Sequence, residues 1–541
     1  YSYKIGNNDQ LNVEYRQNGL DLFGTFQYRL QHLKETGETV QMTDVDTLWK
    51  QRTHSTDLGK NISYFGQFGF NYEINKNHSF GATYELTSAP RDKMSNDNRT
   101  EVYADHELYD VWNTNAFSIE KTYPTHHSNF YYHGDINSLE IDLNADVLVG
   151  KNKEEENIKE LSLNYDDLSM TTFSETSNKL YAGKLVLAYP LFKGRISGGS
   201  EYSYIHRISD FSGFGNQILG TSDKIRERNL AFFLNCTWSL GGIDASAGLR
   251  YEDVKSDFYE NSIYQSDESK HYRNLFPSLS LKGSVGKVHW GLGYHIQVAR
   301  PYYEQLKNEI HYGNRFTYLG GTPNLQPTYI HTAEMRAAYR DLQLSVGYNR
   351  YNDDILFSIE QATSDPKITL IKFRNVEHRD EMTASLVYSP GIGCWRPEWV
   401  ASVQSQWFNI GYLDGTKNMN GITVGIRWNN SFQLPMGYIF RLNGTYTGKG
   451  VYQNSFTRPV SCFGVSIYKS FFNGRLDCTV EGNDLFHTVR DATTQYDNKV
   501  KIYRETQRNT QEVKLTVHYK FNLQKSKYKG TGAGLDEQQR L

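Results

Sequence analysis

The chain of 541 residues carries a net charge of −3 at neutral pH, and 38% of its residues are hydrophobic. This charge balance offers no polyanion-binding surface and disfavours a nucleic-acid-binding protein. No apolar run approaches the roughly 18–20 residues that a membrane-spanning helix requires. Aromatic residues nevertheless make up 14% of the chain. A transmembrane β-barrel reconciles these features, because its strands face lipid only at every second residue and its interfaces are rich in tyrosine.

Strands with two different faces are predicted along the chain, and the clearest lies at 139–147. One face carries apolar side chains and the other polar ones: Leu139, Ile141, Leu143, Ala145 and Val147 against Glu140, Asp142, Asn144 and Asp146. Similar alternation recurs at 342–349, 422–429, 438–446 and 513–521. A period of two indicates a β-strand. In a barrel, the polar face of such a strand lines the lumen.

Ten short turns and ten long polar stretches alternate between the predicted strands. The turns are expected near Asn18-Gly19, Asn75-Lys76-Asn77, Gly134-Asp135, Lys193-Gly194, Gly241-Gly242, Gly286-Lys287, Asp341, Pro390-Gly391, Pro435-Met436-Gly437 and Asn473-Gly474. The long, irregular stretches are expected roughly at 31–60, 87–125, 151–177, 207–225, 253–271, 300–328, 359–370, 410–419, 449–458 and 487–510. This asymmetry is typical of bacterial outer-membrane barrels, whose short turns face the periplasm.

Ten hairpins and a last strand at 511–521 predict an all-β transmembrane antiparallel barrel of about 21 strands over residues 1–522, followed by a C-terminal tail at 523–541. Bacterial single-chain barrels close with an even number of strands. We therefore expect one further strand upstream and about 22 strands in the parent protein. That size is typical of plugged transporters rather than open porins. Alternation is irregular at 350–389, which leaves the count open by two strands.

A soluble β-rich protein, such as a tandem of sandwiches or a propeller, is the structural alternative. Propeller blades repeat at a fixed period, whereas the turns here are unevenly spaced. Sandwich domains need linkers, and the sequence has no stretch rich in Ser, Gly and Pro that would serve as one. The four cysteines lack metal-binding spacing, so we expect small apolar side chains rather than disulfides.

Several motifs resemble those of TonB-dependent receptors. Residues 299–306, ARPYYEQL, and 320–327, GGTPNLQP, are similar to the family's R-P-x-Y-x-x-L strand end and its G-N-P-x-L-x-P loop, with Thr322 where Asn is usual. The tail 527–541 and Asn483-Asp484-Leu485-Phe486 resemble the Bacteroidota outer-membrane β-barrel family within that group. These motifs lie in the C-terminal half of the chain, and the N-terminal half is similar only in its general pattern.

The resemblance implies an outer-membrane importer of a scarce nutrient, such as a metal chelate, an oligosaccharide or a peptide. In that family an N-terminal plug fills the barrel, and a TonB box couples it to the energy of the inner membrane. Neither is recognisable in this sequence, so both are expected upstream of Tyr1. The implied partners are outer-membrane lipid, the TonB complex through that plug, and a small nutrient ligand. A surface lipoprotein is a further partner by analogy.

No catalytic residues, metal site or cofactor are predicted. The sequence contains no G-x-S-x-G, H-E-x-x-H or phosphate-binding loop motif. His126 and His127 are adjacent on a predicted strand, so they point to opposite faces and cannot ligate one ion from one wall. Asn352-Asp353-Asp354 is interpreted as a turn rather than a calcium site.

Two sets of residues are candidate binding sites. The polar face formed by Glu140, Asp142, Asn144 and Asp146 is predicted to face the lumen, where plug docking is favoured over substrate contact. Ligand contact is predicted for the aromatic residues of one external loop: Tyr302, Tyr303, Tyr312, Phe316 and Tyr318. Two functional alternatives remain open, which are a plugless passive porin and an outer-membrane enzyme or adhesion barrel.

Overall fold

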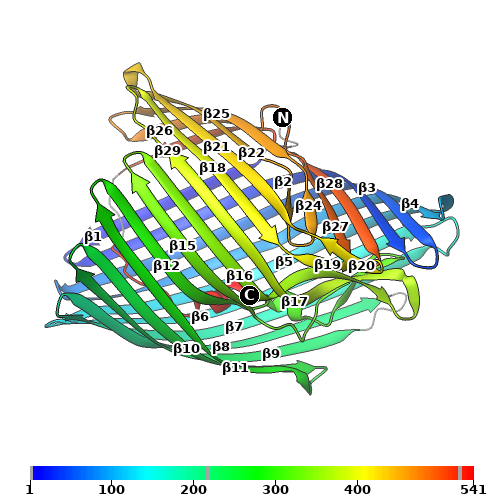
Figure 1. Ribbon diagram of the computed structural model, residues 1–541, viewed down its shortest axis with the longest axis horizontal. Helices are drawn as coiled ribbons and strands as arrows, with labels where there is room; N and C mark the ends of the chain where they lie inside the picture. The colour runs from blue at the N-terminus through cyan, green and yellow to red at the C-terminus, as the bar shows by residue number, and fades with distance from the viewer. Residues whose placement is uncertain (1–3, 215–219, 522–526) are drawn as a thin grey trace.

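A computed structural model describes residues 4–214, 220–521 and 527–541. Antiparallel strands form a tilted wall that curves around a central lumen (Figure 1). The first wall strands are β1 (Asn7–Gln17), β2 (Leu20–Asp44), β3 (Leu48–Asn75), β4 (His78–Ala104), β5 (Glu107–Ile136), β6 (Leu139–Leu161), β7 (Leu168–Leu191), β8 (Gly194–Phe214), β9 (Thr221–Leu240), β10 (Ile243–Glu260), β11 (Ile263–Val285) and β12 (Val288–Ala299). The wall continues through β15 (Thr328–Tyr339), β16 (Leu342–Ala362), β17 (Asp365–Tyr388), β18 (Trp395–Trp407), β21 (Gly421–Gln433), β22 (Tyr438–Thr447), β25 (Val460–Phe471), β26 (Leu476–Asn483) and β29 (Glu512–Tyr519).

The predicted strand count is wrong for the sheet as a whole, which holds 27 strands among the described residues rather than about 21. Six additional short strands lie in the long connections: β13 (Ile310–Asn314), β14 (Thr317–Gly320), β23 (Gly450–Tyr452), β24 (Ser455–Thr457), β27 (Asp491–Asp497) and β28 (Val500–Arg508). A separate two-stranded sheet contains β19 (Asn409–Tyr412) and β20 (Gly415–Asn418). The sequence does not indicate these strands, because polar residues in water pair into hairpins without an alternating hydrophobic pattern.

Most of the expected irregular loops are for the same reason much shorter than predicted, whereas the connection 300–327 has the expected length. The stretch 31–60 is almost entirely paired between β2 and β3, with register partners from Leu20–Tyr72 to Asp44–Leu48. The stretch at 350–389, irregular in sequence, is a nearly continuous pair of β16 and β17. Backbone groups of an extended hairpin bond to each other, so polar side chains do not prevent the strand from continuing beyond the membrane.

The short turns fall largely where the sequence predicts them. Asn18-Gly19 and Gly241-Gly242 connect consecutive wall strands with positive φ angles at both residues. This left-handed backbone is the reason for the Asn-Gly and Gly-Gly pairs. One turn is displaced, because β5 continues past Gly134-Asp135 and turns at Asn137 and Ser138.

The wall is not closed within the described residues, since no pairing joins β1 to β29. β1 runs into the short turn at Asn18, and β29 ends at Tyr519, opposite Leu476 beside the short turn of β25 and β26. The two edge strands therefore run in the same direction. An antiparallel wall can join such edges only through a strand of opposite direction.

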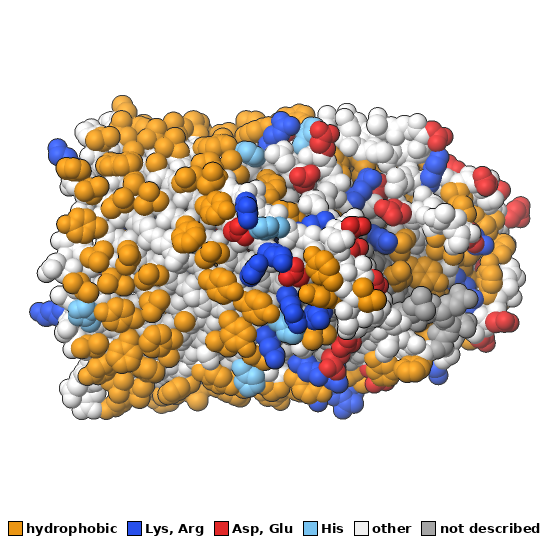
Figure 2. Space-filling view, turned by 90° about the horizontal axis from the view of Figure 1, so that it is seen from below, with side chains coloured by type: hydrophobic (Ala, Val, Ile, Leu, Met, Phe, Trp, Pro, Cys, Tyr) orange, Lys and Arg blue, Asp and Glu red, His pale blue; other side chains and the backbone are white. Residues whose placement is uncertain are grey.

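The two faces of the wall have the predicted polarity. On β6, Leu143 and Val147 are exposed on the outside, whereas Asn144 and Asp146 are buried on the inside. Figure 2 shows that hydrophobic side chains cover the half of the outer surface toward the short turns, and that charged side chains gather toward the long connections. This apolar belt is the surface that a membrane requires of a barrel.

Three short helical elements interrupt the strand architecture. Two 3₁₀ turns, η1 (Tyr303–Leu306) and η2 (Pro435–Gly437), and one five-residue helix, α1 (Leu535–Gln539), lie among the described residues. In that described part of the chain, no helix has the length and apolar character needed to cross a membrane. The four cysteines are free thiols.

Candidate functional site in the lumen

The connection between β12 and β15, residues 300–327, folds into the barrel and is called here the inward loop. It contains η1, β13 and β14, and β14 pairs in parallel with β17 from Thr317 to Leu319. The hydroxyl of Thr322 donates to the carbonyl of Phe373 at 2.7 Å, and the backbone N–H of Gln326 donates to Asn375 at 2.9 Å. These bonds hold the inward loop along the edge of β17, beyond the part of that strand that pairs with β18.

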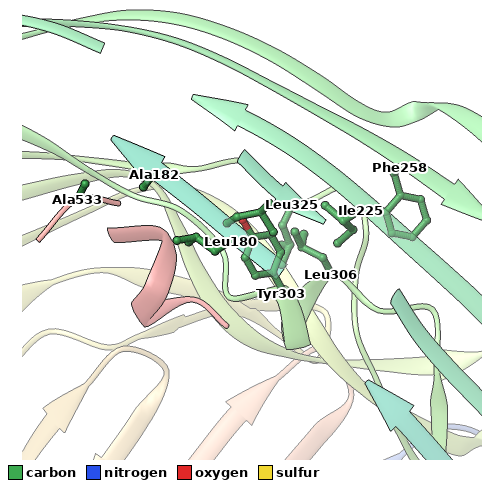
Figure 3. Packing of buried hydrophobic residues seen from close by; sticks show 9 residues of the cluster. Leu180, Ala182, Ile225, Phe258, Tyr303, Leu306, Leu325 and Ala533 are labelled. Atoms are coloured by element: carbon green, nitrogen blue, oxygen red, sulfur yellow. The ribbon is translucent and has the colours of Figure 1, made fainter. Parts of the chain in front are cut away.

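A buried apolar cluster joins the inward loop to the lumen wall. Tyr303, Leu306 and Leu325 pack with wall side chains of β7 to β10 and with one residue from the end of the chain, Ala533. Figure 3 shows the labelled members, with α1 beside them: Leu180, Ala182, Ile225, Phe258, Tyr303, Leu306, Leu325 and Ala533. A hydrophobic core inside the lumen gives the inward loop a fixed position rather than a mobile one.

Tyr303 lies at the centre of this cluster and is fully buried. Its hydroxyl donates to a carboxylate oxygen of Glu227 at 3.0 Å, and the guanidinium of Arg540 lies 4.3 Å from its ring centroid. Burial raises the pKa of Tyr303 well above its ordinary value, so the side chain stays a neutral donor. The predicted ligand-contact residue Tyr302 is its exposed neighbour.

The strands β2 to β6 extend far beyond the membrane and are called here the tall hairpins. The outer part of the inward loop forms an aromatic cluster with them. Phe316 is buried and packs edge-on against Trp49 and Trp112, with ring centroids 5.3 and 5.0 Å apart. Tyr312 and Tyr318 pack edge-on against each other at 5.7 Å and are partly exposed. Of the five predicted ligand-contact residues, the structure therefore buries Tyr303 and Phe316 and leaves ring surface on the other three.

Glu160 anchors this cluster and was not predicted from the sequence. It is fully buried, accepts a hydrogen bond from the Tyr312 hydroxyl at 2.9 Å, and pairs with Arg315 at 2.6 Å. The Thr114 hydroxyl donates to its second oxygen at 2.9 Å. A buried carboxylate is tolerated only when its oxygens are paired in this way.

Glu309 fixes the middle of the inward loop. The hydroxyl of Ser209 on β8 donates to it at 2.6 Å, and His311 and Lys307 approach its other oxygen at 3.3 and 3.4 Å. Burial alone would raise the pKa of Glu309, but the hydrogen bonds and the charge of Lys307 outweigh it and lower the pKa to about 2. The inward loop is therefore attached to β8 by an ionised carboxylate.

The structure divides the predicted polar face of β6 into two pairs. Nearer the short turn, Glu140 pairs with Arg195 at 2.7 Å and Asp142 with His133 at 2.6 Å, so both bind neighbours on the wall. Farther up, Asn144 and Asp146 accept hydrogen bonds from the backbone of residues 531–533. The four residues share a face, but only the upper pair contacts the C-terminal residues 531–533.

The histidines behave as their sequence positions predict. His126 bonds to the outward Tyr84 at 2.6 Å, whereas His127 pairs with the buried Asp146 at 2.8 Å, so the two rings point to opposite faces. A different group, His133, Glu140 and Asp142, brings potential ligand atoms within 4.8 Å of one another. Arg195 already occupies one side of Glu140.

Residues 134–519 match the family model described as the outer membrane protein beta-barrel family. The chain belongs to this outer membrane protein β-barrel family. The antiparallel wall and its apolar belt agree with a β-barrel of the outer membrane. The protein is therefore located in the cell outer membrane.

Solved structures show the same fold at low sequence identity. The outer membrane transporter YddB from Escherichia coli is 9% identical, with a TM-score of 0.53, over 90% of this chain and 76% of that one. The copper transporter OprC is 11% identical, with a TM-score of 0.51, over 88% of this chain and 80% of that one. Both similar structures are transporters. No curated protein sequence matches this member of the family.

Most of the lumen contacts could not be found by sequence reasoning. Glu227 and Arg540 are 313 positions apart, yet they form a buried ion pair. Glu160 lies in an alternating polar stretch that gives no sign of which carboxylate is buried. For Arg540, the only indication in the sequence is its place in the tail motif that resembles the family.

Proposed function

We propose that this barrel is the wall of a TonB-dependent importer for a scarce nutrient, such as a metal chelate, an oligosaccharide or a peptide. The observation that carries the proposal is the inward loop, whose residues Tyr303, Leu306 and Leu325 form a buried core inside the lumen. A passive porin needs a water-filled channel, whereas a transporter keeps its lumen occupied until a ligand passes. The shared fold with outer-membrane transporters supports the same function.

The open wall supports the proposal of an upstream strand and plug. Backbone groups at a sheet edge cannot remain without partners in lipid. A strand of opposite direction between β1 and β29 would satisfy both edges and bring the wall to an even number. We propose that this strand follows a plug domain with a TonB box, as in Bacteroidota members of the TonB-dependent group, and that Glu140 and Asp142 face that plug.

The ligand would first meet the outer half of the barrel. Tyr302, Tyr312 and Tyr318 offer aromatic and hydroxyl surface there, which suits sugars and aromatic chelates alike. A surface lipoprotein that delivers the ligand is a further proposal by analogy with the family.

Uptake by whole cells tests the proposed function. A deletion strain should lose growth on one limiting nutrient, screened as iron chelates, oligosaccharides and peptides, and should regain it with the full-length gene. Dissipation of the proton-motive force should abolish the uptake, because TonB draws on it. Steady ohmic conductance of the full-length protein in planar bilayers would instead identify a passive porin. Turnover of a substrate without uptake would identify an enzyme.

A further inference from the structure

The described end of the chain, residues 527–541, lies inside the barrel and is called here the lumenal tether. Its contacts extend along one track of the inner wall from β2 to β9. The track consists of these bonds: Lys527 N–H to Asp21 at 2.7 Å, Lys527 Nζ to Glu73 at 3.1 Å, Thr531 and Gly532 N–H to Asn144 at 3.0 and 3.2 Å, Ala533 N–H to Asp146 at 2.7 Å, Gly534 N–H to Glu201 at 3.0 Å, and Asn229 to Glu537 at 2.9 Å.

The wall matches the backbone of the tether rather than only its charges. Four successive N–H groups, from Thr531 to Gly534, find their acceptors on three wall side chains. At Gly534, where φ is 63°, an added Cβ would approach Ala182 Cβ to 2.8 Å. Only glycine fits such a close approach with a left-handed backbone. This fit indicates a specific seat for the tether, because a random tail would not place glycine where the wall comes closest.

The far end of the tether binds the inward loop. The guanidinium of Arg540 donates to both oxygens of Glu227, at 2.5 and 3.3 Å, and its Nε donates to the carbonyl of Pro301 at 3.0 Å. The backbone N–H of Tyr303 donates in turn to the carbonyl of Arg540 at 3.3 Å. Arg540 is buried, and it therefore joins β9 to the inward loop through a single side chain.

The tether thus extends from the short-turn end of the lumen to the inward loop. Its first contacts, Asp21 and Glu73, lie beside short turns, whereas its last contacts, Pro301 and Tyr303, lie on the inward loop. We propose that residues 527–541 hold the inward loop in its folded-in position, and that Arg540 provides the main attachment. Removal of Arg540 leaves the Glu227 carboxylate buried without its cation. The free-energy cost of this unpaired carboxylate also affects Tyr303, whose hydroxyl donates to Glu227. Loss of Arg540 therefore favours detachment of the inward loop from the wall.

Hydrogen exchange tests whether the tether occupies its seat in the native membrane. The backbone N–H groups of Thr531, Gly532, Ala533 and Gly534 all donate to wall side chains. In outer-membrane vesicles, these four amides should exchange at least a hundredfold more slowly than in a free peptide of residues 527–541, which is the control. Exchange as fast as in the free peptide would overturn the seat.

A second measurement asks whether the tether holds the inward loop, and it needs no ligand. In purified full-length protein, R540A should speed hydrogen exchange at residues 302–306 at least tenfold. R540K should give an intermediate rate, since lysine keeps the charge but lacks the planar fork. R490A, which removes an exposed arginine from another external connection, is the matched control. Equal rates in R540A and R490A would contradict the proposal, whatever the uptake experiment shows.

Discussion

The two halves of the barrel wall use the same strands in two different solvents. Toward the short turns, β10 and β11 present Leu249 and Leu279 outward to lipid. Toward the long connections, the tall hairpins enclose Phe316 between Trp49 and Trp112 and bury Glu160 with Arg315. The lipid half gains stability from its outer surface, because its environment is apolar. The outer half stands in water and must build hydrophobic and ionic cores within its own connections.

The largest expected effect tests the core of the outer half. Phe316→Ala would empty the space between Trp49 and Trp112 and should cost about 3–5 kcal/mol in the free energy of unfolding of this region. Urea unfolding followed by tryptophan fluorescence would measure the loss. Phe472→Ala, at an exposed short turn, is the control and should change little. Equal effects of the two substitutions would show that the outer half has no core of its own.

A charge on the lipid-facing surface tests the other half. Leu279→Arg should destabilise the barrel by about 2–4 kcal/mol, because arginine near the bilayer midplane loses its hydration. Refolding into lipid vesicles at graded urea concentrations measures the change. The same substitution at Ile263, an exposed residue at an external hairpin tip, should be nearly neutral. A neutral Leu279→Arg would place the membrane elsewhere on the wall.

Acid should weaken the inward loop through Glu309. Its pKa is lowered in the folded protein to about 2 from an ordinary 4.5, so its contribution is complete above pH 4.5 and disappears as the pH falls toward 2. We expect a contribution of roughly 2 kcal/mol, allowing for partial solvent screening. The difference in hydrogen exchange of residues 306–311 between wild type and E309Q should therefore shrink over that range. A difference that is constant with pH would rule out ionisation as its source.

The smallest effect is expected for an exposed ion pair on the inner wall. Glu334 and Arg336 are 2.8 Å apart on β15, but both are solvated. Glu334→Gln should change the free energy of unfolding by less than about 0.5 kcal/mol. The same measurement on E160Q should give a clearly larger loss. If the two were equal, burial would not distinguish the ion pairs of the two halves.

The lipid half was largely predictable from the sequence, and the outer half was not. Alternation at 139–147 identified both faces of β6, because lipid on one side and a polar lumen on the other enforce a period of two. Turn residues such as Gly241-Gly242 were recognisable because a left-handed backbone selects them. The tall hairpins lie where the sequence predicts irregular loops, because water on both faces of a hairpin imposes no such pattern.

The candidate site shows the same division. Tyr302 and Tyr303 were expected to act alike, but Tyr302 is exposed while Tyr303 is buried on Glu227. Adjacent residues in a loop carry no periodic signal that would separate them. The seat of the tether depends on contacts such as Asn144 with Thr531, across 387 positions of sequence. Contacts of that range follow from the curvature of the wall and cannot be predicted from local sequence.

The length of the wall strands has a consequence at the cell surface. β5 contains 30 residues, whereas a tilted transmembrane strand needs only about 9–11. At about 3.3 Å per residue and a tilt near 40°, the strand rises roughly 75 Å along the barrel axis, more than twice the thickness of the hydrocarbon core. The rim of the barrel therefore extends far beyond the outer surface of the bilayer. Antibodies, phages and proteases in the surroundings will meet this rim before they meet any other part of the protein.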